Sequence, residues 1–228
     1  MTGLIVALDD PHIDRAEELA GHLAGSVSAF KVGLTLFTVA GPDAVRRIGR
    51  FGPVFCDLKL HDIPHQVGLA AEQLAKLGAW MFTVHASGGA AMMRAAVDAA
   101  GKSESSPTVS AVTVLTSLSR TDMADLGIDR SPAEQVGRLA RLATQAGVGA
   151  LVCSAQETEL LRKQLGDEVV LVTPGIRPAG SAEGDQVRVV TPARAVEAGA
   201  SYVVVGRPVT DADDPAAAAA SIAEALAT

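Results

Sequence analysis

The sequence predicts one α/β domain, a (β/α)8 (TIM) barrel that spans residues 1–228. Short, nearly continuous apolar runs alternate with amphipathic stretches eight times, a pattern typical of parallel strands covered by helices. Eight such units in 228 residues match the usual size of one barrel. No Gly-x-Gly-x-x-Gly sequence follows the first apolar run, which counts against an open dinucleotide-binding sheet.

Each predicted strand is a short apolar run bounded by Gly, Pro or polar residues. The predicted strands are, in chain order, Leu4–Leu8, Ala29–Gly33, Val54–Leu58, Trp80–His85, Thr108–Leu115, Gly149–Cys153, Val169–Thr173 and Tyr202–Val205. The amphipathic stretches between them predict helices. These are Asp14–Leu23, Pro42–Arg50, Pro64–Leu77, a helix that ends at Ala100, Pro132–Ala146, Gln156–Leu165, Pro192–Ala198 and Pro215–Leu226. The segment between the fifth strand and Pro132 is predicted to be irregular.

Composition argues against several classes of protein. Hydrophobic residues make up 48% of the chain and charged residues 20%, values typical of a globular protein rather than a disordered one. The net charge of −7 argues against nucleic acid or an anionic membrane as the main partner. No apolar run approaches the ~18 residues that a membrane span needs. The composition still allows a local basic pocket for a small phosphorylated molecule.

Cysteine use and the first residues indicate a cellular compartment. Cys56 and Cys153 lie in apolar runs without zinc-like spacing, and we interpret them as buried thiols in a reducing environment. The chain leads directly into a predicted strand rather than into a basic leader. We therefore expect a cytoplasmic protein.

One polar segment stands at the junction of the third strand and the third helix. It reads Asp57-Leu58-Lys59-Leu60-His61-Asp62-Ile63-Pro64-His65-Gln66. Asp57 and Lys59 are two residues apart, so both point to the same face of a strand, and Asp62 follows on the turn. Their ionisations should be coupled, with the lysine charged and the carboxylates ionised. Such a cluster suits proton delivery beside a fixed negative charge, although a helix N-cap with a surface ion pair would use the same residues.

Other polar residues also fall at the carboxyl ends of predicted strands, which converge on one face of a barrel. They are Asp9, Lys31, Asp57, Lys59, His85, Thr116, Arg177 and Arg207. Lys31 lies inside an apolar run and needs a carboxylate nearby to keep its charge, for which Asp9 and Asp57 are suited. Of the five histidines, only His85 is expected to line the site.

A second constellation follows the seventh and eighth strands, where barrels often bind phosphate. Gly206 lets the backbone approach an anion closely and Arg207 can chelate it, although a plain turn with an exposed arginine has the same sequence. The loop from Pro174 to Gln186 contains three glycines, a composition suited to a mobile lid.

These segments resemble the orotidine 5′-monophosphate decarboxylases, in particular the bacterial members, over essentially the whole chain. The Asp-x-Lys-x-x-Asp core is shared with a wider group of barrels, whereas its extension through Ile63-Pro64 and the Thr-Pro-Gly-Ile-Arg-Pro segment are more specific. The segments that carry the resemblance are Val6-Ala-Leu-Asp9, Phe30-Lys31-Val32-Gly33, Asp57 to Pro64, Val84-His85-Ala-Ser-Gly-Gly89, Val112-Thr-Val-Leu-Thr116-Ser117, Val152-Cys-Ser-Ala-Gln156-Glu157, Val172-Thr-Pro-Gly-Ile-Arg177-Pro and Gly206-Arg207-Pro.

The resemblance implies decarboxylation of orotidine 5′-monophosphate to UMP and CO2, the last step of UMP synthesis. It implies that Lys59 protonates C6 of the pyrimidine while Asp57 lies against the departing carboxylate. Lys31 and Asp62 would complete an alternating charge network, with Asp62 reaching into the partner subunit's site in a homodimer. No cofactor or metal ion is implied, so fixed charges and binding energy at the remote phosphate must stabilise the transition state.

The resemblance also implies a set of substrate-binding residues. Asp9 and Lys31 would bind the ribose, Thr116 the base, and Gly206 with Arg207 the phosphate. Gln186 would bridge lid, base and phosphate, and Arg177 opens the lid loop. The motif residues Asp57, Lys59, Asp62, Ile63, Pro64 and Gln66 complete the set. His65 and Gln66 replace an Asn-Thr pair common in the family, which changes the detail of the ribose contact.

Two other functions remain open at this point. One is a metal-dependent decarboxylase or aldolase of the same barrel group, acting on a sugar phosphate such as 3-keto-gulonate 6-phosphate with a divalent ion. The other is a non-catalytic nucleotide-binding module. Intact Lys31, Asp57, Lys59 and Asp62 argue against the module, because binding alone does not require buried alternating charges.

Overall fold

The computed structural model describes residues 2–177 and 190–227. Eight parallel strands form a closed barrel in chain order, with the last strand paired to the first, as the sequence predicts. The strands are β1 Gly3–Ala7, β2 Ala29–Gly33, β3 Val54–Leu60, β4 Met81–His85, β5 Thr108–Val112, β6 Ala150–Val152, β7 Val170–Thr173 and β8 Tyr202–Val205.

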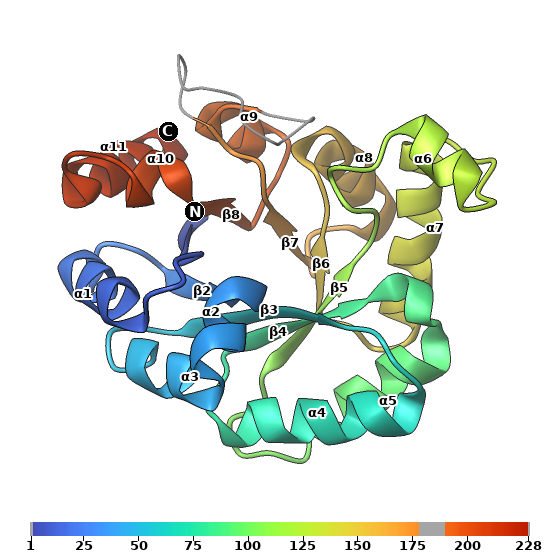
Figure 1. Cartoon of the computed structure of the whole chain (residues 1–228). Coiled ribbons are helices and arrows are strands. Elements are labelled where there is room, and N and C mark those ends of the chain that lie inside the picture. The colour runs from blue at the N-terminus through green and yellow to red at the C-terminus, as the bar shows by residue number, and fades with distance from the viewer. Residues whose placement is uncertain (1, 178–189, 228) are drawn as a thin grey trace.

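Helices form a ring around this barrel (Figure 1). They are α1 Ile13–Leu23, α2 Leu34–Ala40, α3 Pro42–Ile48, α4 Pro64–Lys76, α5 Ala90–Ala100, α6 Arg120–Asp125, α7 Pro132–Gln145, α8 Ala155–Leu165, α9 Pro192–Glu197, α10 Arg207–Thr210 and α11 Pro215–Ala227. A single 3₁₀ turn, η1, covers Ala86–Gly88. In the described part of the chain, none of these helices has the length and apolar character needed to cross a membrane.

The structure adds three short helices to those predicted. The segment before Pro132, predicted to be irregular, contains α6, which begins with a capping box between Ser119 and Asp122. The other two are α2, which directly follows Gly33 at the end of β2, and α10, which directly follows Gly206. Strand limits differ as well, since β5 ends at Val112 rather than Leu115, and β3 continues to Leu60.

Two layers of apolar side chains make up the core. The larger layer lies between strands and helices, and a smaller cluster fills the barrel interior. The interior cluster consists of Ile5, Ala7, Ala29, Phe55, Met81, Ala150, Val172 and Val204. Cys56 and Cys153 are buried free thiols, as predicted, and burial raises the pKa of each to about 12. Packing on both faces of every strand gives the rigid frame that holds the polar residues at the strand ends.

Candidate active site

Four charged side chains form a line across the carboxyl ends of β1, β2 and β3. Lys31 Nζ lies 2.8 Å from Asp9 Oδ1 and 3.8 Å from Asp57 Oδ2. Lys59 Nζ lies 2.8 Å from the same Asp57 oxygen. The carboxylates that the buried Lys31 requires are therefore the two expected from the sequence. Acid and base alternate along the line, so each carboxylate has an ammonium neighbour and like charges are kept apart.

Strand β3 is irregular where it carries Asp57 and Lys59. Cys56 pairs with Phe82 of β4, and the next pair joins Leu60 to Val84, so four residue steps on β3 match two on β4. The extra residues bulge out of the ladder, and Lys59 within them has a φ of +52°. This left-handed conformation is costly for a lysine and is typical of functional positions.

The Asp57 carboxylate is held ionised by its neighbours. Burial alone would raise the pKa of this largely buried carboxyl. The ammonium groups of Lys31 and Lys59, together with hydrogen bonds from Lys59 and Thr83, outweigh burial and hold the pKa of Asp57 below its ordinary value. A fixed negative charge therefore stands beside the Lys59 ammonium at neutral pH.

Glycine at position 33 leaves the space that the ion pair of Lys31 occupies. A Cβ at this position would lie 2.6 Å from Asp9 Oδ1 and 2.8 Å from Lys31 Nζ. Neither atom could stay in place beside it, so a side chain here would displace the ion pair between Asp9 and Lys31.

The second half of the motif lies at the exposed surface of the chain. Asp62, Ile63, Pro64 and Gln66 are exposed, and Asp62 Oδ1 accepts a hydrogen bond from the Ile63 N–H at 2.6 Å. The N-cap of α4 is Ile63, which gives no side-chain cap, so an N-cap role for Asp62 is wrong. Among the described residues of this chain, Asp62 forms no ion pair with Lys59.

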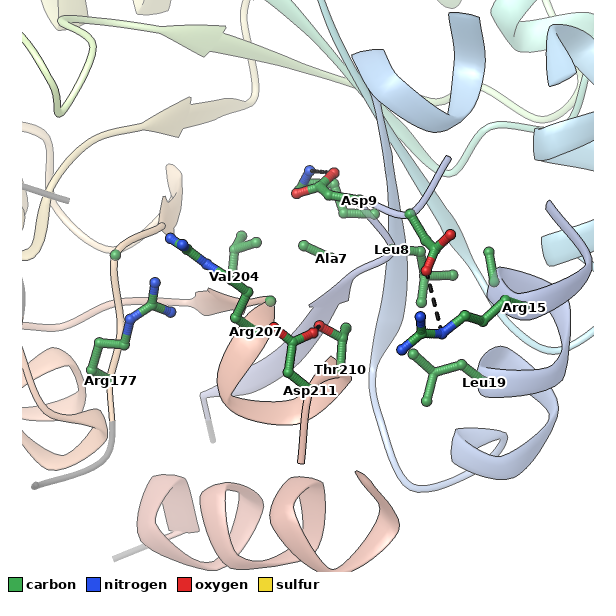
Figure 2. A pocket seen from close by; sticks show the side chains of 15 residues that line it. Ala7, Leu8, Asp9, Arg15, Leu19, Arg177, Val204, Arg207, Thr210 and Asp211 are labelled. Atoms are coloured by element: carbon green, nitrogen blue, oxygen red, sulfur yellow. Dashed lines mark hydrogen bonds and ion pairs between the residues drawn. The ribbon is translucent and has the colours of Figure 1, made fainter. Parts of the chain in front are cut away.

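A cavity of about 490 Å³ adjoins the charge line at Asp9 and Lys31. Figure 2 shows Arg177 and Arg207 on one side of this cavity, and Arg15 with Leu19 on the opposite side. Arg177 is only 8% exposed and Arg207 lies at the start of α10, next to Gly206. Two guanidinium groups at one end, with a glycine turn between strand and helix, suit a phosphate or carboxylate.

Gly206 leaves this end of the cavity open. A Cβ at position 206 would lie 3.6 Å from Ala7 Cβ, which is an ordinary contact. Packing within the chain therefore does not require glycine here, and the free space is available to a ligand that approaches the backbone.

Three predicted site residues remain, namely Thr116, Gln186 and His85. Thr116 follows β5 in a half-buried turn, and Gln186 lies outside the described residues. The half-buried His85 ends β4 and contacts His61, with ring centroids 5.3 Å apart. Burial, followed by the neighbouring His61 and Lys59, lowers the pKa of His85. The lowered pKa favours the neutral form of His85, and its place in the site stays a prediction.

Sequence reasoning did not identify three residues that shape this site. Gly33 makes room for an ion pair, Arg15 lines the cavity, and Thr83 bridges two residues of the motif. Thr83 could have been identified from the sequence, because it is a polar residue inside the apolar run of β4, two residues before His85. Strand alternation places both side chains on the same face.

A closed parallel barrel whose polar residues gather at the carboxyl ends of the strands defines the class, a (β/α)8-barrel enzyme. Residues 2–222 match the family model described as Orotidine 5'-phosphate decarboxylase / HUMPS family. An orotidine 5'-phosphate decarboxylase of Moorella thermoacetica is 51% identical over 227 residues, covering 96% of this chain and 90% of the relative. The enzyme of the same name from Anaeromyxobacter dehalogenans is 53% identical over 224 residues, covering 98% and 97%.

Solved structures agree with these sequence matches. The crystal structure of orotidine 5'-phosphate decarboxylase from Lactobacillus acidophilus has a TM-score of 0.88 and 37% sequence identity, covering 100% of both chains. The chain therefore belongs to the orotidine 5'-phosphate decarboxylase / HUMPS family, which confirms the resemblance drawn from the motifs.

Proposed function

We propose that this enzyme decarboxylates orotidine 5′-monophosphate to UMP and CO2 in pyrimidine nucleotide biosynthesis. The observation that carries the proposal is the ion-paired line from Asp9 to Lys59, which adjoins a cavity containing two arginines. The line supplies a proton donor beside a fixed negative charge, and the arginines supply an anion site. The relatives at about half identity that carry the decarboxylase name support this branch of the family.

The reaction needs one bond broken and one formed at C6 of the base. The C6–carboxylate bond breaks, CO2 leaves, and the electron pair stays on C6. Lys59 then gives its Nζ proton to C6, forming the C6–H bond, and regains a proton from solvent after product release. The Asp57 carboxylate would face the substrate carboxylate, so the departure of CO2 relieves a like-charge contact. The same carboxylate stabilises the Lys59 ammonium until the proton moves.

The cavity accounts for how the rest of the nucleotide would lie. The phosphate would bind between Arg177, Arg207 and the backbone of Gly206, with Gln186 also contributing. The ribose hydroxyls would meet Asp9 and Lys31, which pair with each other at 2.8 Å. Binding energy at the phosphate then positions C6 against Lys59, so an interaction far from the bond change contributes to the rate.

The charges around Asp57 favour this chemistry over the metal-dependent alternative. A divalent ion needs carboxylates with free negative charge, whereas Asp57 Oδ2 already has two ammonium groups within 3.8 Å. A cation placed there would meet two like charges. Within residues 2–177 and 190–227, no group of three or more His, Cys, Asp or Glu side chains is placed to hold a metal ion. We propose that the reaction needs no cofactor.

Substrate preference tests the choice between the two branches. We expect the purified protein to turn over orotidine 5′-monophosphate, measured by loss of its ultraviolet absorbance, and to leave 3-keto-gulonate 6-phosphate unchanged. The pairing of Asp57 with two lysines provides no ion to stabilise the enediolate that the sugar phosphate requires. Turnover of the sugar phosphate alone would reject the proposed function.

We further propose that the domain acts as a homodimer in the cytoplasm and that Asp62 completes the partner subunit's site. Asp62 is exposed and makes no ion pair among the described residues of its own chain. Exposed apolar side chains on α2, on α4 and directly before α4 offer surface for a partner. They are Leu34, Val39, Ile63 and Leu69, each at least 46% exposed.

Mixing two inactive variants tests the shared site. Lys59→Ala and Asp62→Ala subunits, unfolded and refolded together, are expected to recover about one quarter of the wild-type sites, because one site of each mixed dimer contains neither change. Activity is measured against each variant refolded alone. No gain over the separate variants would show that Asp62 acts within its own chain or not at all.

A matched control for this mixing experiment uses two residues that one chain contributes to the same site. Asp57 and Lys59 lie 2.8 Å apart within one chain, so each site of a mixed dimer would keep one of the two changes. Mixing Lys59→Ala with Asp57→Ala subunits is therefore expected to recover no activity.

A further inference from the structure

The hydroxyl of Thr83 connects the two central residues of the charge line. Thr83 Oγ1 accepts a hydrogen bond from the backbone N–H of Lys59 at 2.8 Å. The same hydroxyl donates to Asp57 Oδ1 at 3.0 Å. Thr83 lies on β4 and is fully buried, so no water competes for these bonds.

The bond to Lys59 holds a conformation that the chain does not adopt by itself. Lys59 has a positive φ within the bulge of β3, where the regular ladder to β4 is interrupted. Its N–H therefore has no ladder partner at this point, and the Thr83 hydroxyl takes that place. A buried N–H left without a partner would cost free energy, and the strained turn would relax.

The bond to Asp57 fixes the orientation of the carboxylate. Oδ2 faces the ammonium groups of Lys59 and Lys31, and Oδ1 receives the Thr83 hydroxyl. With one oxygen held on each side, the carboxylate plane cannot rotate. The Lys59 N–H occupies one side of the Thr83 hydroxyl oxygen, so the hydroxyl proton is directed towards Asp57.

We propose that Thr83 is a positioning residue for the reaction: its hydroxyl sets the backbone of Lys59 and the carboxylate of Asp57 in the geometry that delivers the proton. In this proposal Thr83 acts through Lys59 and Asp57 rather than on the substrate itself. This inference rests on the proposed function, but the hydrogen bonds on which it is built can be tested without turnover.

The neighbouring strand provides a matched control. Ser110 of β5 is paired in register with Thr83, is equally buried, and its Oγ has no hydrogen-bond partner among the described residues. Removing this hydroxyl leaves no donor or acceptor behind. Thr83→Val and Ser110→Ala thus each remove one buried hydroxyl at the same level of the barrel, and only the first touches Asp57 and Lys59.

Kinetics separate positioning from a general loss of structure. Thr83→Val should lower kcat by about 10- to 100-fold while KM changes by less than about threefold. The substitution displaces the proton donor, Lys59, but leaves the residues that bind the phosphate unchanged. Thr83→Ser should restore the wild-type kcat, and Ser110→Ala should match wild type. Equal losses in Thr83→Val and Ser110→Ala, or a fully active Thr83→Val enzyme, would overturn the inference. If Thr83→Val does not fold, Thr83→Cys, with its weaker donor, should lower kcat in the same direction.

The pH profile gives a second readout. The Thr83 hydrogen bond is one of the contacts that lower the pKa of Asp57, so its loss should move the acid limb of kcat/KM to higher pH. The other groups around Asp57 are Lys31 of β2, Lys59 and Cys56 of β3, and His85 of β4, and the substitution changes none of these residues. An acid limb that does not move in Thr83→Val would contradict the proposed contact.

A titration that needs no turnover separates this inference from the proposed function. The side-chain carboxyl carbon of Asp57, followed by NMR, should titrate at higher pH in Thr83→Val than in Thr83→Ser or wild type. If the wild-type protein failed to convert the nucleotide, the proposed function would fall, and this titration would still decide where the Thr83 hydroxyl acts. Identical midpoints in all three proteins would reject the inference.

Discussion

Replacing Lys59 by alanine is expected to lower kcat for orotidine 5′-monophosphate by about 10⁴-fold, because the change removes both the proton donor and the positive charge nearest the reacting carbon. The protein should remain folded. Lys31 Nζ still lies 3.8 Å from Asp57 Oδ2, so the buried carboxylate keeps one ammonium neighbour. Decarboxylation is followed by ultraviolet absorbance, and the fold by circular dichroism.

Lys76→Ala is the matched control for this experiment. Lys76 is exposed on α4, pairs with Glu72 one helical turn away, and lies outside the charge line. Its loss should leave kcat within about twofold of wild type, as expected for an exposed ion pair. A Lys59→Ala enzyme that retained a tenth or more of the wild-type kcat would rule out Lys59 as the proton donor.

Replacing Arg207 by alanine is expected to lower kcat/KM for the nucleotide by about 10²- to 10³-fold, equivalent to about 3–4 kcal/mol of transition-state binding. Arg207 begins α10 beside Gly206 and lines the cavity with Arg177, which suits a charge-assisted contact to the phosphate. The nucleoside orotidine, which lacks the phosphate, should react equally slowly with both enzymes. Steady-state kinetics with the two substrates measure the contrast.

Arg194→Ala tests whether the effect is specific to this arginine. Arg194 lies on α9, is 66% exposed in its side chain and pairs with Glu197. Its removal should change neither substrate's kcat/KM. If Arg207→Ala reduced turnover of orotidine as much as turnover of the nucleotide, Arg207 would act on the base or ribose and the phosphate assignment would be wrong.

The repeating part of this structure could be predicted from sequence because each strand and each helix has its own local pattern. Apolar runs and amphipathic stretches specify eight units, and a barrel then places all strand ends on one face. The same reasoning identified the partners of Lys31, because a charged side chain within an apolar strand must meet a carboxylate.

Contacts between strands could not be predicted in the same way. The bulge in β3 depends on the register against β4, and no local pattern in Asp57-Leu-Lys59 marks it. The role of Thr83 follows only from that register, since the hydroxyl must come within hydrogen-bond distance of a backbone N–H that the bulge leaves free. Gly33 was missed for a similar reason, because it makes room for an ion pair between Lys31 and Asp9, a residue that follows the neighbouring strand β1.

We propose that fixed charges of the chain carry out the reaction without a metal ion, and an assay in the absence of metal tests this. Protein stripped of metal is assayed with orotidine 5′-monophosphate in excess chelator, and release of CO2 and UMP is measured. We expect the same kcat with and without chelator, because Lys31, Asp57 and Lys59 supply the charges. No turnover, or turnover only after magnesium is added, would contradict it.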